Sequence, residues 1–210
     1  MSLPTVLAGV DPTWWAEGQA SPDPALVSRA RVSALGERVL ASWLAAGPGA
    51  ALLGPTPERE VGTVAVRWPR EKLAPFVRDL GILAMAPAIR AEIGRDAVRR
   101  LKQSLGNSYL LALDRTVWDG KVAPGSLPAM AAALRTALPA DGQGPETLYV
   151  LFDRQGRSEL RAWGARHDRA LGEWIALLYP REPDLPALLP AGQVQLLHEH
   201  HLARERGAAS

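Results

Sequence analysis

The chain has 210 residues, with 24 Lys and Arg against 22 Asp and Glu, and it has no cysteine. The absence of cysteine excludes disulfides, thiol nucleophiles and cysteine-ligated metal sites, and it favours a reducing compartment. The nearly balanced charge lacks the basic excess of most dedicated nucleic-acid binders. A content of 47% apolar residues excludes a disordered or collagen-like chain.

Neither a secretory signal nor a membrane span is visible in the sequence. No basic segment precedes an apolar stretch at the N-terminus. The longest apolar run, residues 80–89, is about half as long as a membrane-spanning helix. We therefore expect a soluble, cytoplasmic protein.

The first half of the chain predicts an irregular arm followed by helices. Residues 1–20 show no sustained period and carry the pair Trp14 and Trp15. From residue 21 a helix is expected, with Val32, Leu35, Val39 and Trp43 as its inward stripe. Residues 47–60 read as a loop, and residues 61–68 as a short edge strand or an extended connector. Short helices are then expected between residues 70 and 118, with breaks at Pro87, Gly94 and Gly106.

The second half predicts helices on both sides of a β-hairpin. A helix is expected over 127–138, a linker over 140–145, and helices over 171–178 and 191–205. Between them, residues 147–152 and 157–163 resemble two strands joined by the turn 153–156. The predicted fold class is mainly α: one compact helical domain over 21–206 with one late β-hairpin, and any subdivision at linker 140–145.

The sequence offers no motif for an enzyme. It lacks a nucleophile elbow, a P-loop and a dinucleotide-binding fingerprint. Asp153 fits a hairpin turn better than a phosphotransfer nucleophile. His198, His200 and His201 form the one histidine cluster of the sequence. His198 and His201 share a helix face and would need a third ligand such as Glu205 to hold a metal, so a solvated face is favoured for the cluster. We expect no catalytic residues, no metal and no cofactor.

Two features favour binding to another macromolecule. The basic stretch 90–102 offers Arg90, Arg95, Arg99, Arg100 and Lys102 for an acidic protein partner. Its helix–turn–helix pattern also suggests a DNA- or RNA-binding regulator, although the second helix, 108–118, is mostly apolar. Trp14 and Trp15 are the candidate apolar anchors, because exposed aromatic residues favour protein contacts.

The stretch from Leu73 to Leu113, "LAPFVRDLGILAMAPAIRAEIGRDAVRRLKQSLGNSYLLAL", carries a family resemblance. Its marks are Leu80-Gly81 in an apolar helix, the "AIR" of residues 88–90, and Leu105-Gly106 before a second apolar helix. It resembles the accessory proteins of bacterial type III secretion known as the YscK or SctK family.

The resemblance implies a helical adaptor without enzymatic activity. Such an adaptor joins the C-ring-like protein of the injectisome sorting platform to the cytoplasmic domain of an inner-membrane ring protein. It would lie in the cytoplasm, peripherally at the inner membrane, without inserting into it and without binding nucleic acid. The family supplies no catalytic residues to carry over.

Overall fold

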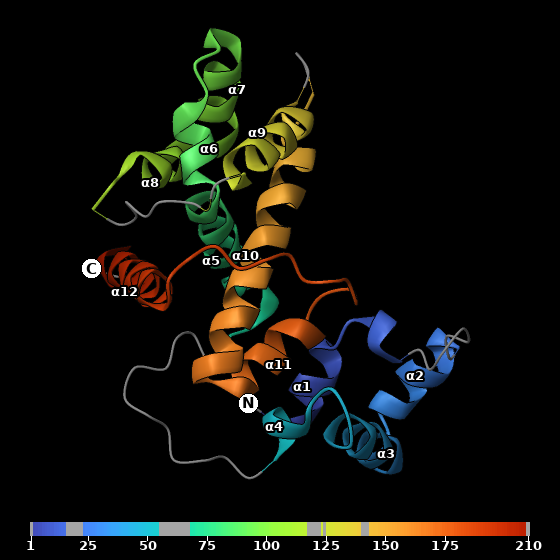
Figure 1. Cartoon of the computed structure of the whole chain (residues 1–210). Coiled ribbons are helices and arrows are strands. Elements are labelled where there is room, and N and C mark those ends of the chain that lie inside the picture. The colour runs from blue at the N-terminus through green and yellow to red at the C-terminus, as the bar shows by residue number, and fades with distance from the viewer. Residues whose placement is uncertain are drawn as a thin grey trace. The chain divides into compact units, whose positions relative to one another are not determined.

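The computed structural model describes residues 2–15, 23–54, 68–116, 123, 125–139 and 143–208, and all regular structure in these ranges is helical (Figure 1). The chain forms two compact units. Unit 1 comprises residues 1–72 and 161–184, and unit 2 comprises residues 73–160 and 185–210. The long helix α10 (Glu146–His167) contributes residues to both units.

Unit 1 is a cluster of short helices around one apolar centre. Its elements are α1 (Leu3–Gly9), the 3-10 helix η1 (Pro12–Trp15), α2 (Pro24–Arg31), α3 (Ala34–Ala45), α4 (Ala50–Leu53) and α11 (Arg169–Leu177). Leu7, Leu44 and Trp174 are almost fully buried in its core. The Glu173 carboxylate accepts hydrogen bonds from the amides of Ala51 and Leu52, 2.7 and 2.8 Å away. Glu173 therefore satisfies free amides at the start of α4, which has no capping side chain of its own.

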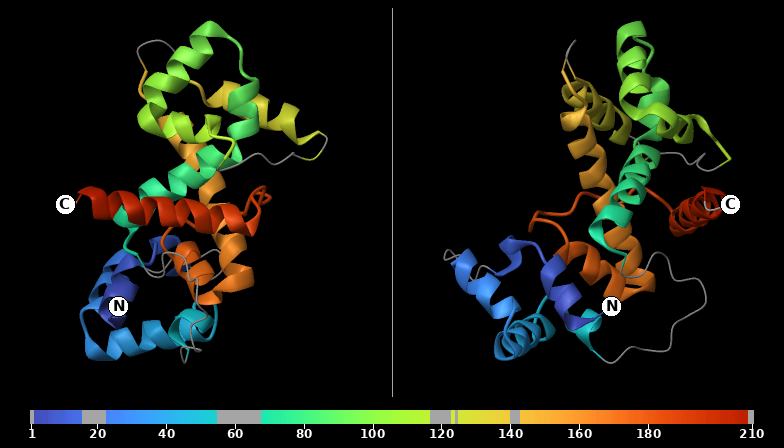
Figure 2. Two further views of the ribbon diagram at one scale, coloured as in Figure 1. Left: turned by 90° about the vertical axis from the view of Figure 1, so that its left-hand side faces the viewer. Right: turned by 180° about the vertical axis from the view of Figure 1, so that it is seen from behind.

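Unit 2 is built on two helices that lie side by side, α5 (Arg70–Ala84) and the first part of α10 (Figures 1 and 2). The remaining elements are α6 (Ala86–Ala91), α7 (Arg95–Leu105), the 3-10 helix η2 (Gly106–Ser108), α8 (Tyr109–Leu113), α9 (Ser126–Ala137) and α12 (Ala191–Ala208). Helix α6 packs against both α8 and α9. Phe76, Leu80 and Phe152 are completely buried in the core.

Two glycines set how closely α5 and α10 approach each other. A Cβ atom added at Gly81 would overlap the carbonyl oxygen of Phe152, and one added at Gly156 would overlap the carbonyl oxygen of Val77. Each helix therefore presents a glycine to the backbone of the other. Only glycine leaves enough room for this contact, since any side chain would force the helices apart.

The predicted β-hairpin is wrong, because residues 147–163 lie within helix α10. The buried positions follow a helical period through Leu148, Phe152, Gln155, Glu159 and Trp163. Two of these five positions, Gln155 and Glu159, are polar, so the helical period of apolar residues is interrupted in the sequence. Polar and apolar residues then roughly alternate over 157–163, which is the pattern of a strand. Asp153 and Gly156 are accordingly helical residues, not turn residues.

The start of the chain also differs from the prediction. The expected irregular arm contains α1 and η1, and these two elements bury Val6, Leu7 and Trp15. The helix expected from residue 21 is two helices, because Ser33 caps a new one by accepting a hydrogen bond from the Gly36 amide. Three of the four residues of its predicted inward stripe face solvent instead, since Val32, Leu35 and Val39 are exposed by 84%, 69% and 60%. The fourth, Trp43, is half-buried.

Other boundaries agree with the sequence. Asp23 and Pro24 begin α2, Pro87 lies in the first turn of α6, and Gly106 ends α7 with a φ of +52°. Residues 61–67 of the predicted strand, residues 117–118 and residues 140–142 of the predicted linker lie outside the described residues.

Replacing either glycine of the helix crossing should destabilise the fold. We expect Gly81→Ala and Gly156→Ala each to lower the free energy of unfolding by at least about 2 kcal/mol, because the added methyl group meets a backbone carbonyl that cannot move aside alone. Gly192→Ala in α12 is the control, since nothing lies within 4 Å of its Cβ position, and it should change stability by less than about 1 kcal/mol. Urea unfolding followed by circular dichroism measures all three. Equal effects at all three positions would contradict the proposed close contact.

Candidate functional site

Three of the five predicted cations form one face of α7. Arg95, Arg99 and Lys102 are exposed and follow one another at steps of four and three residues, which places them on the same side of a helix. The other side of α7 is held in the core through Leu101 and Leu105. We call Arg95, Arg99 and Lys102 the cationic face.

The cationic face is only weakly neutralised by the described residues. Arg99 forms an ion pair with Asp96 at 3.2 Å, but both side chains are more than half exposed. Such a pair contributes little, because water screens it. The Lys102 ammonium lies 5.8 Å from the centre of the Tyr109 ring.

The other two predicted cations have structural contacts inside unit 2. Arg90 donates a hydrogen bond to the carbonyl oxygen of Ala112 at 3.1 Å, and Arg100 donates one to that of Pro139 at 3.0 Å. Both arginines are half-buried. Arg90 holds α8 and Arg100 holds Pro139, just after α9, against the rest of the unit. The basic stretch therefore contains both surface cations and cations that take part in packing.

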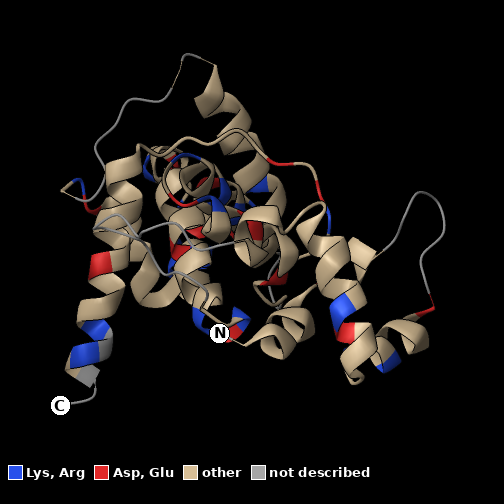
Figure 3. Ribbon diagram, turned by 90° about the horizontal axis from the view of Figure 1, so that it is seen from below, with Lys and Arg blue, Asp and Glu red and all other residues tan. Residues whose placement is uncertain are grey.

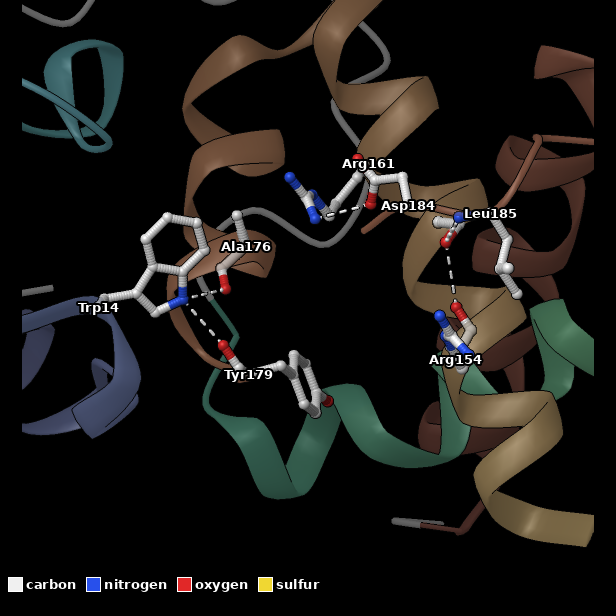
Figure 4. Close-up of polar contacts among 8 residues, drawn as sticks. Trp14, Arg154, Arg161, Ala176, Tyr179, Asp184 and Leu185 are labelled. Atoms are coloured by element: carbon white, nitrogen blue, oxygen red, sulfur yellow. Dashed lines mark hydrogen bonds and ion pairs between the residues drawn. The ribbon is translucent and has the colours of Figure 1, made fainter. Parts of the chain in front are cut away.

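The predicted apolar anchors are packed into unit 1. The Trp14 indole nitrogen donates to the carbonyl oxygens of Ala176 and Tyr179, at 3.0 and 2.8 Å (Figure 4). Trp15 is only 6% exposed, and its ring centre lies 5.6 Å from that of Trp43. Trp15 is thus a core residue and Trp14 fixes η1 to the end of α11, so neither indole is a freely exposed anchor.

A buried polar pair joins α5 to α12. The Nε2 atom of His201 lies 2.9 Å from Oδ2 of Asp79, and the two side chains are 13% and 6% exposed. The His201 ring also meets the edge of Phe76, with ring centres 5.3 Å apart. The solvated-face interpretation of the histidines is therefore wrong for His201, although it holds for the exposed His200.

A pocket of about 520 Å³ opens beside this pair, and its lining combines apolar with charged side chains. Arg78 lies in it and donates through Nε and Nη2 to both carboxylate oxygens of Asp153, each at 2.9 Å. This hydrogen-bonded carboxylate raises the pKa of Arg78. Arg204 also lines the pocket, in the strongly charged last part of α12 (Figure 3). The charged groups of the lining are thus of both signs, with Asp79 beside Arg78 and Arg204.

The Ser104 and Ser108 side chains line the same pocket. A histidine activates a serine only when the hydroxyl lies within hydrogen-bond distance. Among the described residues, the polar contact of His201 is with Asp79, and neither serine hydroxyl bonds to it. The arrangement is a buried hydrogen-bonded pair that holds α12 on α5.

A second buried carboxylate holds the extended segment before α12. Glu159 is 2% exposed and accepts hydrogen bonds from the amides of Leu188 and Leu189, at 2.8 and 3.0 Å, and from the Gln155 amide group at 2.7 Å. Burial raises the pKa of Glu159 above its ordinary 4.5, although the three hydrogen bonds oppose this. Glu159 therefore ionises at a lower pH in the unfolded chain than in the folded protein. As a result, the free energy of unfolding decreases as pH rises from 4.5 through the native pKa of Glu159.

Neither Asp79 nor Glu159 was among the functional residues predicted from the sequence. A signal for His201 was present, because Val194, Leu197 and His201 share one face of α12. Asp79 interrupts the apolar residues of α5, and a carboxylate that is buried at such a position needs a hydrogen-bond donor or a cation as its partner. That partner lies 122 residues away in the chain, so sequence spacing does not reveal it.

The chain matches no family model, no curated protein and no solved structure. In the part of the chain that the structure describes, no helix combines the length and apolar character needed to cross a membrane. The same residues contain no group of three His, Asp or Glu side chains placed to hold a metal ion.

Removing the Glu159 carboxylate should loosen the segment before α12. We expect Glu159→Ala to lower the free energy of unfolding by about 2–4 kcal/mol, because three buried donors lose their acceptor. Glu199→Ala, on the exposed side of α12, is the control and should change stability by less than about 0.5 kcal/mol. Hydrogen exchange should show faster exchange at Leu188 and Leu189 in Glu159→Ala only. Unchanged protection of these amides would disprove the role of Glu159.

Proposed function

We propose that this protein is a cytosolic adaptor without enzymatic activity that binds other proteins, and that the cationic face of α7 is a docking surface. The observation that carries the proposal is the placement of Arg95, Arg99 and Lys102 on one exposed side of a helix. Three cations spread along about two turns can face several carboxylates of a partner helix or loop at once.

The helix behind this face is well supported, which favours a docking role. Leu101 and Leu105 bury its inner side, and Arg100 bonds to the carbonyl oxygen of Pro139. A helix fixed in this way presents its charges with little loss of conformational entropy on binding. Complementary charge then accelerates association and orients the partner.

The resemblance of residues 73–113 to the YscK or SctK family supports a specific setting. In that setting the protein links the C-ring-like protein of a type III secretion sorting platform to the cytoplasmic domain of an inner-membrane ring protein. The adaptor lies peripherally at the cytoplasmic face of the inner membrane. The cationic face lies within residues 73–113. The family resemblance and the exposed cations therefore support the proposal from the same segment of the chain.

A nucleic-acid-binding regulator is the competing interpretation of the same cations. Helix α8, which follows α7 and η2, points Leu110 and Leu113 outward, with exposures of 62% and 44%. These side chains offer no hydrogen bonds to base edges, whereas a recognition helix needs them. The exposed surface of α8 therefore favours the adaptor over the regulator.

Charge reversal on the cationic face tests the adaptor. We expect Arg95→Glu/Arg99→Glu to weaken capture of the platform and ring proteins at least about tenfold, which corresponds to ~1.4 kcal/mol. Crosslinking in the native host followed by mass spectrometry identifies the captured proteins, and circular dichroism verifies the fold.

The matched control is Arg115→Glu/Arg135→Glu, which makes the same charge change at two other exposed arginines of unit 2. Its capture should equal that of the unchanged protein. Equal capture by the Arg95→Glu/Arg99→Glu variant would remove the cationic face from the proposal. Recovery of nucleic acid without these proteins, with an affinity that falls steeply with salt, would favour the regulator instead.

A further inference from the structure

Unit 1 carries a row of exposed aliphatic side chains on the outside of α3. Val32, in the turn before the helix, is 84% exposed, and Leu35 and Val39 are 69% and 60% exposed. Leu35 and Val39 are four residues apart and therefore lie on the same side of α3, and Val32 precedes them at the end of α2. Single exposed aliphatic residues are common, but an aligned row indicates a binding surface. We call Val32, Leu35 and Val39 the aliphatic row.

The packing of α3 fixes the row in its outward position. A Cβ atom added at Gly36 would overlap the backbone of Ala30, so α3 crosses α2 closely at that point. Leu44, on the opposite side of α3 from Leu35, is completely buried. Rotating α3 to bury the row would break both contacts, so the aliphatic row stays uncovered by the described residues of unit 1.

An apolar groove runs beside the row on the same helix. Its volume is about 470 Å³, and its lining comprises Leu3, Val6, Ala41, Ser42, Ala45, Leu52 and Leu53 from α1, α3 and α4. Ala41 and Ala45 supply small side chains on the α3 side of the groove. The helical period places Arg38 and the groove residue Ser42 between these alanines and the side of α3 that carries Leu35 and Val39.

Arg38 gives this surface its charge. The side chain is exposed, and its Nε donates to the Ala34 carbonyl of its own helix at 3.2 Å. Arg29 on α2 is exposed as well, three residues after the exposed Leu26. The nearest acidic residue of α3, Glu37, is half-buried and lies on the inward side of the helix. The exposed surface therefore combines aliphatic side chains with positive charge.

We propose that the aliphatic row and the adjoining groove bind an amphipathic helix of a partner protein, with an acidic side chain of that helix facing Arg38. Because α3 has 12 residues, a partner helix of about three turns matches its length. Its apolar residues would recur at three- and four-residue steps, as in other helix-in-groove complexes. This inference rests on the proposed adaptor function and gives it a second binding surface, in unit 1.

Two other occupants fit the surface less well. In a symmetric contact with a second copy, the same patch meets itself. Arg38 would then approach a surface whose exposed charges are also positive. A membrane-surface helix carries aromatic and long basic residues around its apolar side, whereas the exposed apolar residues here are Leu and Val.

A photo-crosslinking amino acid at Val39 of the full chain tests the proposal in the native host. We expect irradiation to attach one defined segment of a partner protein, with apolar residues at helical spacing and at least one Asp or Glu among them. A synthetic peptide of that segment should bind the purified chain. Its affinity should fall at least tenfold in Leu35→Asp/Val39→Asp and in Arg38→Glu.

The matched control is Leu110→Asp/Val150→Asp, because these unit 2 side chains are 62% and 63% exposed, close to those of Leu35 and Val39. This control should bind the peptide like the unchanged chain. All substituted side chains are exposed, and circular dichroism verifies each fold.

Several outcomes would overturn the inference. They are the absence of any crosslinked protein, crosslinks only to a second copy of this chain, or a peptide that binds Leu35→Asp/Val39→Asp normally. Flotation with vesicles of phosphatidylcholine and phosphatidylglycerol examines the membrane alternative, and binding that the same variant abolishes would establish it. The Arg95→Glu/Arg99→Glu variant should keep the Val39 crosslink, so failure of the cationic face and failure of this surface are distinguishable.

Discussion

The contact between Gly81 of α5 and Gly156 of α10 determines the architecture of unit 2. At this crossing each glycine meets a backbone carbonyl of the opposite helix. The close approach buries Phe76, Leu80 and Phe152 around it. It also brings the polar side chains of both helices within reach of one another. Arg78 of α5 and Asp153 of α10 bond across the crossing because their helices are so close.

Buried polar groups then attach the C-terminal part of the chain to this helix pair. Asp79 binds His201 of α12, while Ser158 and Glu159 bind the amides of the extended segment that leads to it. A buried carboxylate without a hydrogen-bond partner would destabilise the folded state, but Asp79 and Glu159 each have defined partners. The polar groups thus specify where the segment after residue 184 lies, which apolar packing alone would determine less precisely.

The two candidate surfaces use different chemistry. Unit 2 exposes three cations on α7, and unit 1 exposes two aliphatic residues on α3 and a third just before it. The first favours rapid, oriented association, and the second favours a contact that excludes water. A protein that joins two partners benefits from two surfaces that do not compete for the same ligand. In both cases the helix that carries the surface is fixed by a buried opposite side.

The sequence by itself determined the helical class, many helix ends and the absence of cysteine chemistry. Local rules act at these positions: Asp23 and Pro24 begin a helix, Pro87 permits only a new first turn, and Gly106 adopts a positive φ. The tertiary structure alone decided which side of α3 is buried, since that side is set by the packing of α3 against α1, α2 and α4. It also decided that residues 147–163 are helical, because the buried polar residues Gln155 and Glu159 find their partners in the segment 186–189 and not in their own sequence neighbourhood alone. The tertiary structure also decided which cations of the stretch 90–102 are exposed and which are half-buried. Packing, and not sequence spacing, brings the carbonyl groups that bind Arg90 and Arg100 close to them.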